Sequence, residues 1–356
     1  MGATPTQQTM LALAFLADAD FKQPFMNDCT TAVAVYGVIE SNLAILNQKT
    51  NADWNVVWGP TLFSFPGTAG GRFIDNCIYV ARNGNNNQYV IAIAGTDRYS
   101  WDDWAFEDFL VGSKVPWPFK FVPNPKDPFA PVPENTAGDI SLGTFLGLSI
   151  LLNLQVCCET SGGGNPLPGE GMQLLPFLAS IVEDQPVEVC TTGHSLGGAL
   201  SPTLALALVE MRSQWDPKGI ATVSPFSFAG PTPGDVTFAS YFNTRLPNLQ
   251  RIWNNLDVVP HAWDVAHLKE IPTLYGTHPI DVILAVDLLV QKVGHLDYAP
   301  LNDAAPAFDG PLQKIPGLTP TEQFVREAVL QHINAYQNWA GIEGWFSLNS
   351  SPPPAP

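Results

Sequence analysis

A serine flanked by glycines stands near the middle of the chain, in the segment Gly193-His-Ser195-Leu-Gly197. A short apolar run typical of a buried strand precedes it, and small residues and leucines at helical spacing follow to about residue 211. This order of strand, pentapeptide and helix is what a nucleophile elbow requires, because the serine occupies a strained turn that glycines make room for. The pattern predicts that Ser195 is a nucleophile toward acyl groups; an ordinary glycine turn is the alternative.

A nucleophilic serine needs an imidazole to accept its proton and a carboxylate to orient that imidazole. Where the serine lies on a nucleophile elbow, the acid and then the histidine follow it along the chain. Asp257 ends the apolar strand pattern of residues 250–255 and is therefore the predicted acid. Asp235 and Asp264 are the alternatives, and a capping or turn role for Asp257 also stays open.

The histidine that serves Ser195 is less clear from chain order. His194 adjoins the nucleophile, so we expect its side chain to point away from the hydroxyl. His332 lies near the end of the chain, where a last loop or helix can return to the strand tips, and it is favoured over His295, which we interpret as part of an edge strand. Spacing excludes none of the three histidines that follow Asp257 closely, which are His261, His267 and His278.

The elements that must position these residues alternate between strands and helices. Strand patterns occur at 78–82, 89–94, 223–229 and 250–255, and helical patterns at 10–17, 140–156 and about 321–338. This alternation predicts an α/β fold with a mostly parallel central sheet, helices on both faces, and chemistry at the carboxyl ends of the strands. We expect an amphipathic helix at 10–17 and a long irregular excursion at 112–138, which is rich in proline and aromatic residues.

Composition excludes some classes of partner. The chain has 356 residues, 46% of them hydrophobic, and 33 acidic residues against 16 Lys and Arg give a formal charge of −17. Such a balance argues against nucleic acid and against electrostatic docking on anionic lipid. No apolar run approaches the length of a membrane span and no signal peptide is recognised, so we expect no transmembrane segment, and the compartment stays open between cytoplasm and export with a trimmed leader.

Taken together, these residues resemble the class 3 lipase family of fungi and plants, which has the α/β-hydrolase fold. Besides the serine pentapeptide, the resemblance rests on four segments, which are Ala94-Gly-Thr-Asp97, Phe228-Ala-Gly-Pro-Thr-Pro-Gly-Asp235, Arg251-Ile-Trp-Asn-Asn-Leu-Asp-Val-Val-Pro260 and His332-x-x-x-Tyr336. It implies that Asp257 is the triad acid, that His332 is the triad histidine, and that Thr96 and the backbone N–H of Leu196 bind the oxyanion. The chain departs from the family pattern at Ala94 and Thr232, where the family has arginine, and in the segment 140–145, which lacks the family's histidine.

The resemblance also implies a lid at about 98–138 whose aromatic side chains meet an oil–water interface. These side chains are Trp101, Trp104, Phe106 and Phe109. A surface helix that packs the same side chains inward is the alternative. The rest of residues 1–349 is expected to form a single domain with this lid, and the Pro-rich tail 350–356 is expected to be disordered.

The activity implied by the resemblance is that of a serine carboxylic ester hydrolase that works through an acyl-enzyme, most of all a triacylglycerol lipase. Its partner would be a lipid or other ester substrate, and the chemistry needs no metal or organic cofactor. Phospholipase A1, feruloyl esterase and polyester hydrolase activities share the same residues. An acyltransferase and a catalytically silent binding protein on the same fold are the alternatives from other classes.

Overall fold

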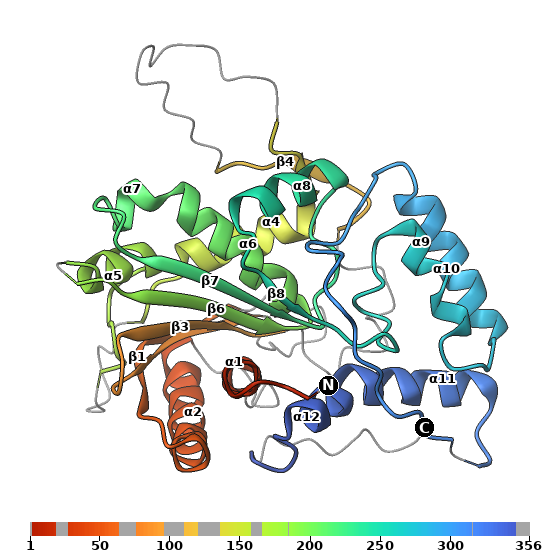
Figure 1. The fold of residues 1–356 in the computed structure, drawn as a ribbon, viewed down its shortest axis with the longest axis horizontal. Coiled ribbons are helices and arrows are strands. Elements are labelled where there is room, and N and C mark those ends of the chain that lie inside the picture. Colours follow the sequence, from red (N-terminus) through yellow and green to blue (C-terminus); the bar gives the residue numbers. More distant parts are fainter. Residues whose placement is uncertain are drawn as a thin grey trace.

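A six-stranded sheet forms the centre of the computed structural model, which describes residues 2–18, 28–63, 76–95, 110–119, 136–157, 166–183, 185–314 and 316–346 (Figure 1). Its strands are β1 (Trp54–Phe63), β2 (Asn76–Asn83), β3 (Gln88–Ile93), β6 (Glu188–His194), β7 (Thr222–Phe228) and β8 (Gln250–Ile252), and they lie side by side in that order. The first three pair antiparallel, and β3, β6, β7 and β8 pair parallel. The predicted α/β fold with a mostly parallel central sheet is confirmed.

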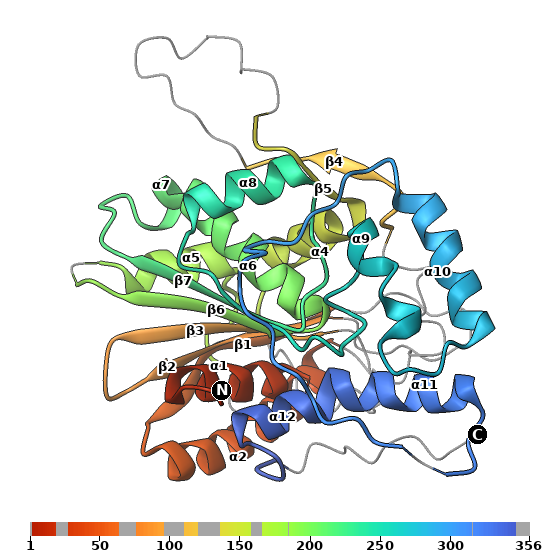
Figure 2. The ribbon, with the colours of Figure 1, turned by 45° about the vertical axis from the view of Figure 1, so that its right-hand side comes forward.

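Helices cover both faces of this sheet (Figures 1 and 2). One face carries α4 (Leu142–Asn153), α5 (Leu174–Ile181), α6 (Leu196–Glu210), α7 (Arg212–Trp215) and α8 (Val236–Arg245), and the other carries α1 (Pro5–Ala17), α2 (Asp28–Thr50) and α12 (Ala335–Ala340). A strand covered on both faces reads as continuously apolar or small, as in β3 and β6. Their central residues are accordingly buried, for example Val90, Ile91, Val189 and Cys190.

Helix α1 differs from its prediction. It begins with a capping box in which Thr4 and Gln7 bond each other's backbone N–H groups, followed by Pro5. Every residue from Met10 to Ala17 is buried, with at most 2% of its surface exposed. The amphipathic helix predicted at 10–17 is therefore wrong: a helix that is apolar all round is enclosed on all sides, here between the sheet and its neighbours.

Helix α2 overturns the prediction that no run reaches the length of a membrane span. By length and composition alone, Cys29–Thr50 is apolar enough to cross one. One of its faces, however, carries Val35, Ile39, Leu43 and Leu46 into the main hydrophobic core. The core helix of a globular protein passes the same test of length and composition, and this packing accounts for the apolar residues of one face.

Beyond β8, the chain builds a second apolar cluster at the carboxyl ends of the strands. It comprises α9 (Val265–Leu268), η2 (Ile271–Thr273), α10 (Ile280–Val293) and α11 (Pro320–Val329). The chain then continues as a π-helical turn, η3 (Leu330–Asn334), into α12. The helix predicted at 321–338 thus exists but changes its winding in the middle. His295 follows the end of α10 as an exposed turn residue, so its predicted edge strand is wrong.

The predicted excursion at 112–138 has an ordered base. Strand β4 (Lys114–Pro116) pairs antiparallel with β5 (Asp139–Ser141), so the chain returns beside the point where it left. Trp117 packs on the ring of Phe238 in α8, with ring centroids 5.2 Å apart. Residues 120–135 and the tail 347–356 lie outside the described residues, and the division into one domain, a lid and a tail remains a prediction.

Candidate active site

Ser195 occupies a sharp turn between β6 and α6. Its φ of 60° and ψ of −125° lie outside the regions that side-chain-bearing residues favour. Its N–H donates to the carbonyl of Phe228 in β7 at 3.0 Å, and its carbonyl accepts from Gly198 at 2.8 Å. The hydroxyl therefore stands at the carboxyl end of the central strand, directly before the N-terminus of α6.

The glycines beside Ser195 are required by close backbone contacts. A β-carbon on Gly193 would collide with the backbone of Gly197, and one on Gly197 would collide with the carbonyl of Ile93. The helix therefore approaches both β3 and β6 more closely than any larger residue permits. This contact brings the start of α6 against the end of β3 and the two residues that follow it, Ala94 and Gly95.

A buried acid–base pair lies on two other elements. Nδ1 of His332 is 2.9 Å from Oδ2 and 3.0 Å from Oδ1 of Asp257. Because a carboxylate only accepts, the Nδ1–H donates, which leaves Nε2 as the acceptor of this ring. Asp257 is fully buried and His332 is 2% exposed, so this charge-assisted hydrogen bond is shielded from water.

Two further groups fix the Asp257 carboxylate. The hydroxyl of Tyr336 donates to Oδ2 at 3.0 Å, and the N–H of Val259 donates to Oδ1 at 3.0 Å. The same Tyr336 oxygen accepts from the N–H of Asn254 at 2.9 Å. Burial and the Asp257 charge hold the pKa of Tyr336 well above its ordinary value, so the phenol stays protonated and remains a donor.

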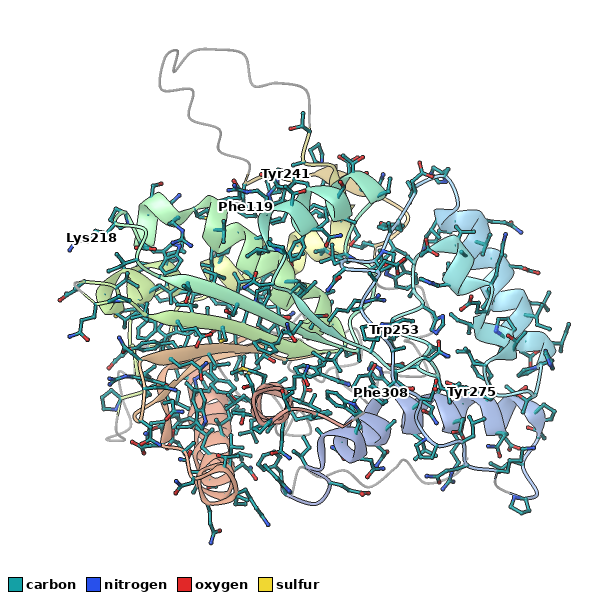
Figure 3. All side chains as sticks on the ribbon, in the orientation of Figure 1. Phe119, Lys218, Tyr241, Trp253, Tyr275 and Phe308 are labelled. Atoms are coloured by element: carbon teal, nitrogen blue, oxygen red, sulfur yellow. The ribbon has the colours of Figure 1, made fainter. Side chains whose placement is uncertain are left out.

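Aromatic side chains pack around Tyr336, which holds the Asp257 carboxylate. The ring of Phe308 lies 5.1 Å from Tyr336 and stacks on Trp339 at 5.2 Å, between centroids. Figure 3 shows Phe308 close to Trp253, where the strands end above α11 and α12. The backbone of Phe308 also bonds Trp253 and Asn255, which anchors the segment that leads into Asp257.

His194 is a part of the site whose role the sequence reasoning missed. Its Nε2–H donates to the backbone carbonyl of His332 at 2.8 Å, and the two rings lie 4.6 Å apart between centroids. The ring of Phe15 in α1 also packs on His194, with ring centroids 4.8 Å apart. The side chain next to Ser195 thus holds the backbone of His332.

The turn that carries His332 is π-helical. This winding is rare in proteins, and where it occurs it is often found at functional sites. The amide of Asn254 donates to the carbonyl of Gln331 at 3.0 Å and to its side-chain oxygen at 2.7 Å. Gln331 in turn donates to the buried carboxylate of Glu327 at 2.8 Å. This network connects the π turn to the Asp257 segment at its base.

The alternative residues have other positions. Asp235 and Asp264 are helix N-caps that accept from Phe238 and His267, respectively. His261 donates from Nε2 to the carbonyl of Asn255 at 3.0 Å and thereby holds the backbone two residues before Asp257. His267 contacts Asp264, and His278 has a backbone φ of 47°. The imidazole in contact with Asp257 is that of His332.

The two predicted oxyanion donors differ in what is described. Leu196 is the first residue of α6, where backbone N–H groups have no partner within the helix. Thr96 lies outside the described residues, but its neighbour Gly95 does not. The N–H of Gly95 donates to Oδ1 of Asp18 at 2.7 Å, and a β-carbon on Gly95 would lie 3.1 Å from that of Ser195. Asp18 was not predicted, because it is 177 residues from Ser195 (195 − 18) and belongs to no motif.

The predicted lid aromatics Trp101, Trp104, Phe106 and Phe109 also lie outside the described residues. Within the described part of the chain, no group of three or more His, Cys, Asp or Glu side chains is arranged to hold a metal ion. The described arrangement places a serine hydroxyl at a helix N-terminus and, on a separate turn, an imidazole held by a carboxylate.

Comparison with known proteins agrees with this geometry. The family model for class 3 lipases matches residues 170–266, which include Ser195, Leu196 and Asp257. The chain is 35% identical over 97 residues to the chloroplastic phospholipase A1-Igamma2 of Arabidopsis thaliana, and 36% identical over 75 residues to a lipase of Rhizopus niveus. These matches cover 25% and 21% of this chain but only 18% of each relative.

One solved structure is similar over nearly the whole chain. The M37 lipase superimposes with a TM-score of 0.79 and 28% identity, covering 96% of this chain and 94% of that one. The similarity therefore extends well beyond residues 170–266, into the segments that carry Asp18 and His332.

Proposed function

We propose that this chain is a carboxylic ester hydrolase of the class 3 lipase kind, which its matches to that family support, and that it hydrolyses esters through Ser195, Asp257 and His332. Triacylglycerols are its proposed main substrates. The observation that carries this proposal is the contact of His332 Nδ1 with the buried Asp257 carboxylate at 2.9 Å. A second observation supports the proposal: His194, the residue before Ser195, donates a hydrogen bond to the backbone carbonyl of His332.

In the proposed reaction, the Ser195 oxygen attacks the ester carbonyl while His332 Nε2 takes its proton. The Leu196 N–H and Thr96 stabilise the oxyanion, an effect commonly worth several kcal/mol. His332 then gives the proton to the departing alcohol, and the acyl-enzyme remains. Water attacks this ester with His332 again as base, the acid is released, and the proton returns to Ser195.

Ester hydrolysis by matched variants tests this assignment. We expect Ser195→Ala and His332→Ala to reduce kcat on p-nitrophenyl esters by roughly a thousandfold or more, because triad members act as a unit. His295→Ala is the control, since this histidine is exposed and belongs to the turn after α10. Activity that survives in a folded His332→Ala variant would refute the assignment of the base.

Phospholipid is the second candidate substrate, because the name of the Arabidopsis relative specifies phospholipase A1. Initial rates on triolein and on phosphatidylcholine, each in mixed micelles with the same detergent, separate the two. A higher kcat/KM on triolein supports the lipase proposal, and release of the sn-1 acyl chain at a higher kcat/KM supports the alternative.

A further inference from the structure

A small cavity lies behind the nucleophile elbow, on the side of α6 that faces away from β3. Its walls come from the start of α6, the end of β7, the segment 230–233, β8 and residues 300–301. The space open to the centre of a water molecule is ≈ 10 Å³, which is about what a single water needs. Pro202, Pro231, Pro233 and Pro300 form much of its lining, and prolines bring no N–H donors.

Two buried polar groups line this cavity and lack hydrogen bonds to any described residue. They are the Nη1 and Nη2 atoms of Arg251 and the Oγ1 atom of Thr232. Arg251 is 9% exposed and Thr232 is 3% exposed, so bulk water does not satisfy them. A buried donor without a partner costs about 1–3 kcal/mol, and more when the donor is charged.

The charge of Arg251 is only partly compensated. Oδ1 of Asp303 is 3.6 Å from Nη1, which is too long for a hydrogen bond, and 65% of the Asp303 side chain is exposed. The ring of Trp253 lies under the guanidinium at 4.6 Å and supplies a weaker attraction. Burial lowers the pKa of Arg251 to about 10, so the group still carries its full charge at neutral pH.

We propose that this cavity binds a single chloride-sized anion between the guanidinium of Arg251 and the hydroxyl of Thr232. Both protein groups offer donors, so the ligand must accept hydrogen bonds. The small space favours a monatomic anion over sulfate, phosphate and carboxylates, each of which has several heavy atoms. A water molecule fits the space but leaves the buried charge in place, whereas a monatomic anion neutralises it.

The anion would connect elements that carry the active site. The backbone N–H of Thr232 donates to the carbonyl of Ala262 at 2.7 Å, five residues beyond Asp257 (262 − 257). Arg251 belongs to β8, which leads into the same segment, and Gly198 belongs to α6. Occupancy should therefore stabilise the folded state without contacting substrate, and the proposal does not depend on the proposed function.

Thermal unfolding in chloride and in gluconate tests the site. At constant sodium, ionic strength and pH, we expect Tm of the wild type to rise with chloride along a saturable curve, as for a ligand that binds only the folded state. Thr232→Val keeps the shape and the backbone bond to Ala262 while it removes the hydroxyl. We expect it to raise the apparent Kd for chloride about fivefold, the effect of one hydrogen bond of ~1 kcal/mol.

Two arginine variants complete the series. Arg251→Met should abolish the chloride response, and Arg326→Met, which removes an exposed arginine from α11, should retain it. If Arg251→Met does not fold, the weaker chloride response of Thr232→Val still tests the site. This variant is expected to fold, because in gluconate it should be at least as stable as the wild type. A wild-type Tm that is equal in chloride and gluconate overturns the proposal and leaves water in the cavity.

Crystals grown with sodium bromide give an independent readout. We expect an anomalous peak within hydrogen-bond distance of Arg251 and Thr232 in the wild type, and none there in Arg251→Met or, if that variant does not fold, a weaker one in Thr232→Val. Density without anomalous signal at this position in the wild type would identify a water molecule and contradict the proposal.

Discussion

At the scale of single residues, Asp18 contacts the end of β3 beside Ser195, although it lies far from every motif in the sequence. Its carboxylate accepts the N–H of Gly95 at 2.7 Å, and Gly95 directly precedes Thr96, the proposed oxyanion donor. A hydrogen bond to a charged acceptor is about twice as strong as a neutral one. Asp18 is therefore expected to act as a positioning residue for the strand end beside Ser195.

We expect Asp18→Ala to lower kcat about tenfold with little change in KM, because loss of a whole oxyanion donor costs 10²- to 10³-fold and loss of its anchor should cost less. Asp18→Asn can still accept the Gly95 N–H and should recover most of the activity. Steady-state kinetics on a soluble short ester measure both variants. Equal losses of kcat in the two variants would indicate that the charge, and not the acceptor, is what matters.

At the scale of elements, the position of Ser195 depends on the close contact of α6 with β3 and β6. Gly197→Ala would place a methyl group against the carbonyls of Ile93 and Ala94, so we expect it to lower the free energy of unfolding by about 3 kcal/mol, the upper end of the usual cost of overpacking. Gly37→Ala is the matched control. Its position on α2 has nothing within 4 Å, and it should gain up to about 1 kcal/mol. Urea denaturation followed by circular dichroism measures both, and similar midpoints for the two variants would contradict the role of the contact.

The sequence predicted those elements whose patterns are local. The four strands at 78–82, 89–94, 223–229 and 250–255 occur near their predicted positions, because apolar runs bounded by turn residues identify buried strands. Helices α2 and α10 and strand β1 were not predicted. The apolar residues of α2 surround the helix without a clear single face, and only the tertiary structure shows which of them are covered.

For the candidate site, motif order was sufficient to predict Ser195, Asp257 and His332 as candidates, and the structure brings the last two into contact. It did not reveal the roles of His194, Asn254 and Asp18. Each of these acts through a hydrogen bond to a residue at least 77 positions away. Such contacts follow from how the elements pack, which no local pattern encodes.

At the scale of the whole molecule, stability should depend on pH through His261. Burial lowers the pKa of His261, and His267 adds to the effect, while the Asn255 carbonyl, Glu270 and Asp257 oppose it. A histidine whose folded pKa lies below its unfolded value of about 6.5 binds its proton mainly in the unfolded chain. Its contribution is therefore complete above pH 6.5 and is lost as the pH falls from there toward the folded pKa.

The variant His261→Gln isolates this contribution, because the glutamine amide can still donate to Asn255 but does not titrate. We expect the free energy of unfolding of the wild type to fall relative to the variant below pH 6.5, by at most about 1.4 kcal/mol per pH unit for one proton. Urea titrations at pH 7.5, 6.5 and 5.5 measure the difference. A constant difference across the three would show that His261 does not titrate on unfolding.

The strand order of the sheet has a consequence for synthesis. The strands β1, β2, β3, β6, β7 and β8 neighbour one another in the order in which they occur along the chain. During synthesis, each strand after the first can therefore pair with a neighbour that has already left the ribosome. The serine turn can form once β7 and α6 have emerged, and the carboxylate follows with β8. The imidazole arrives last, from the π turn at residues 330–334, so a nascent chain builds most of its core before it holds a complete set of reactive groups.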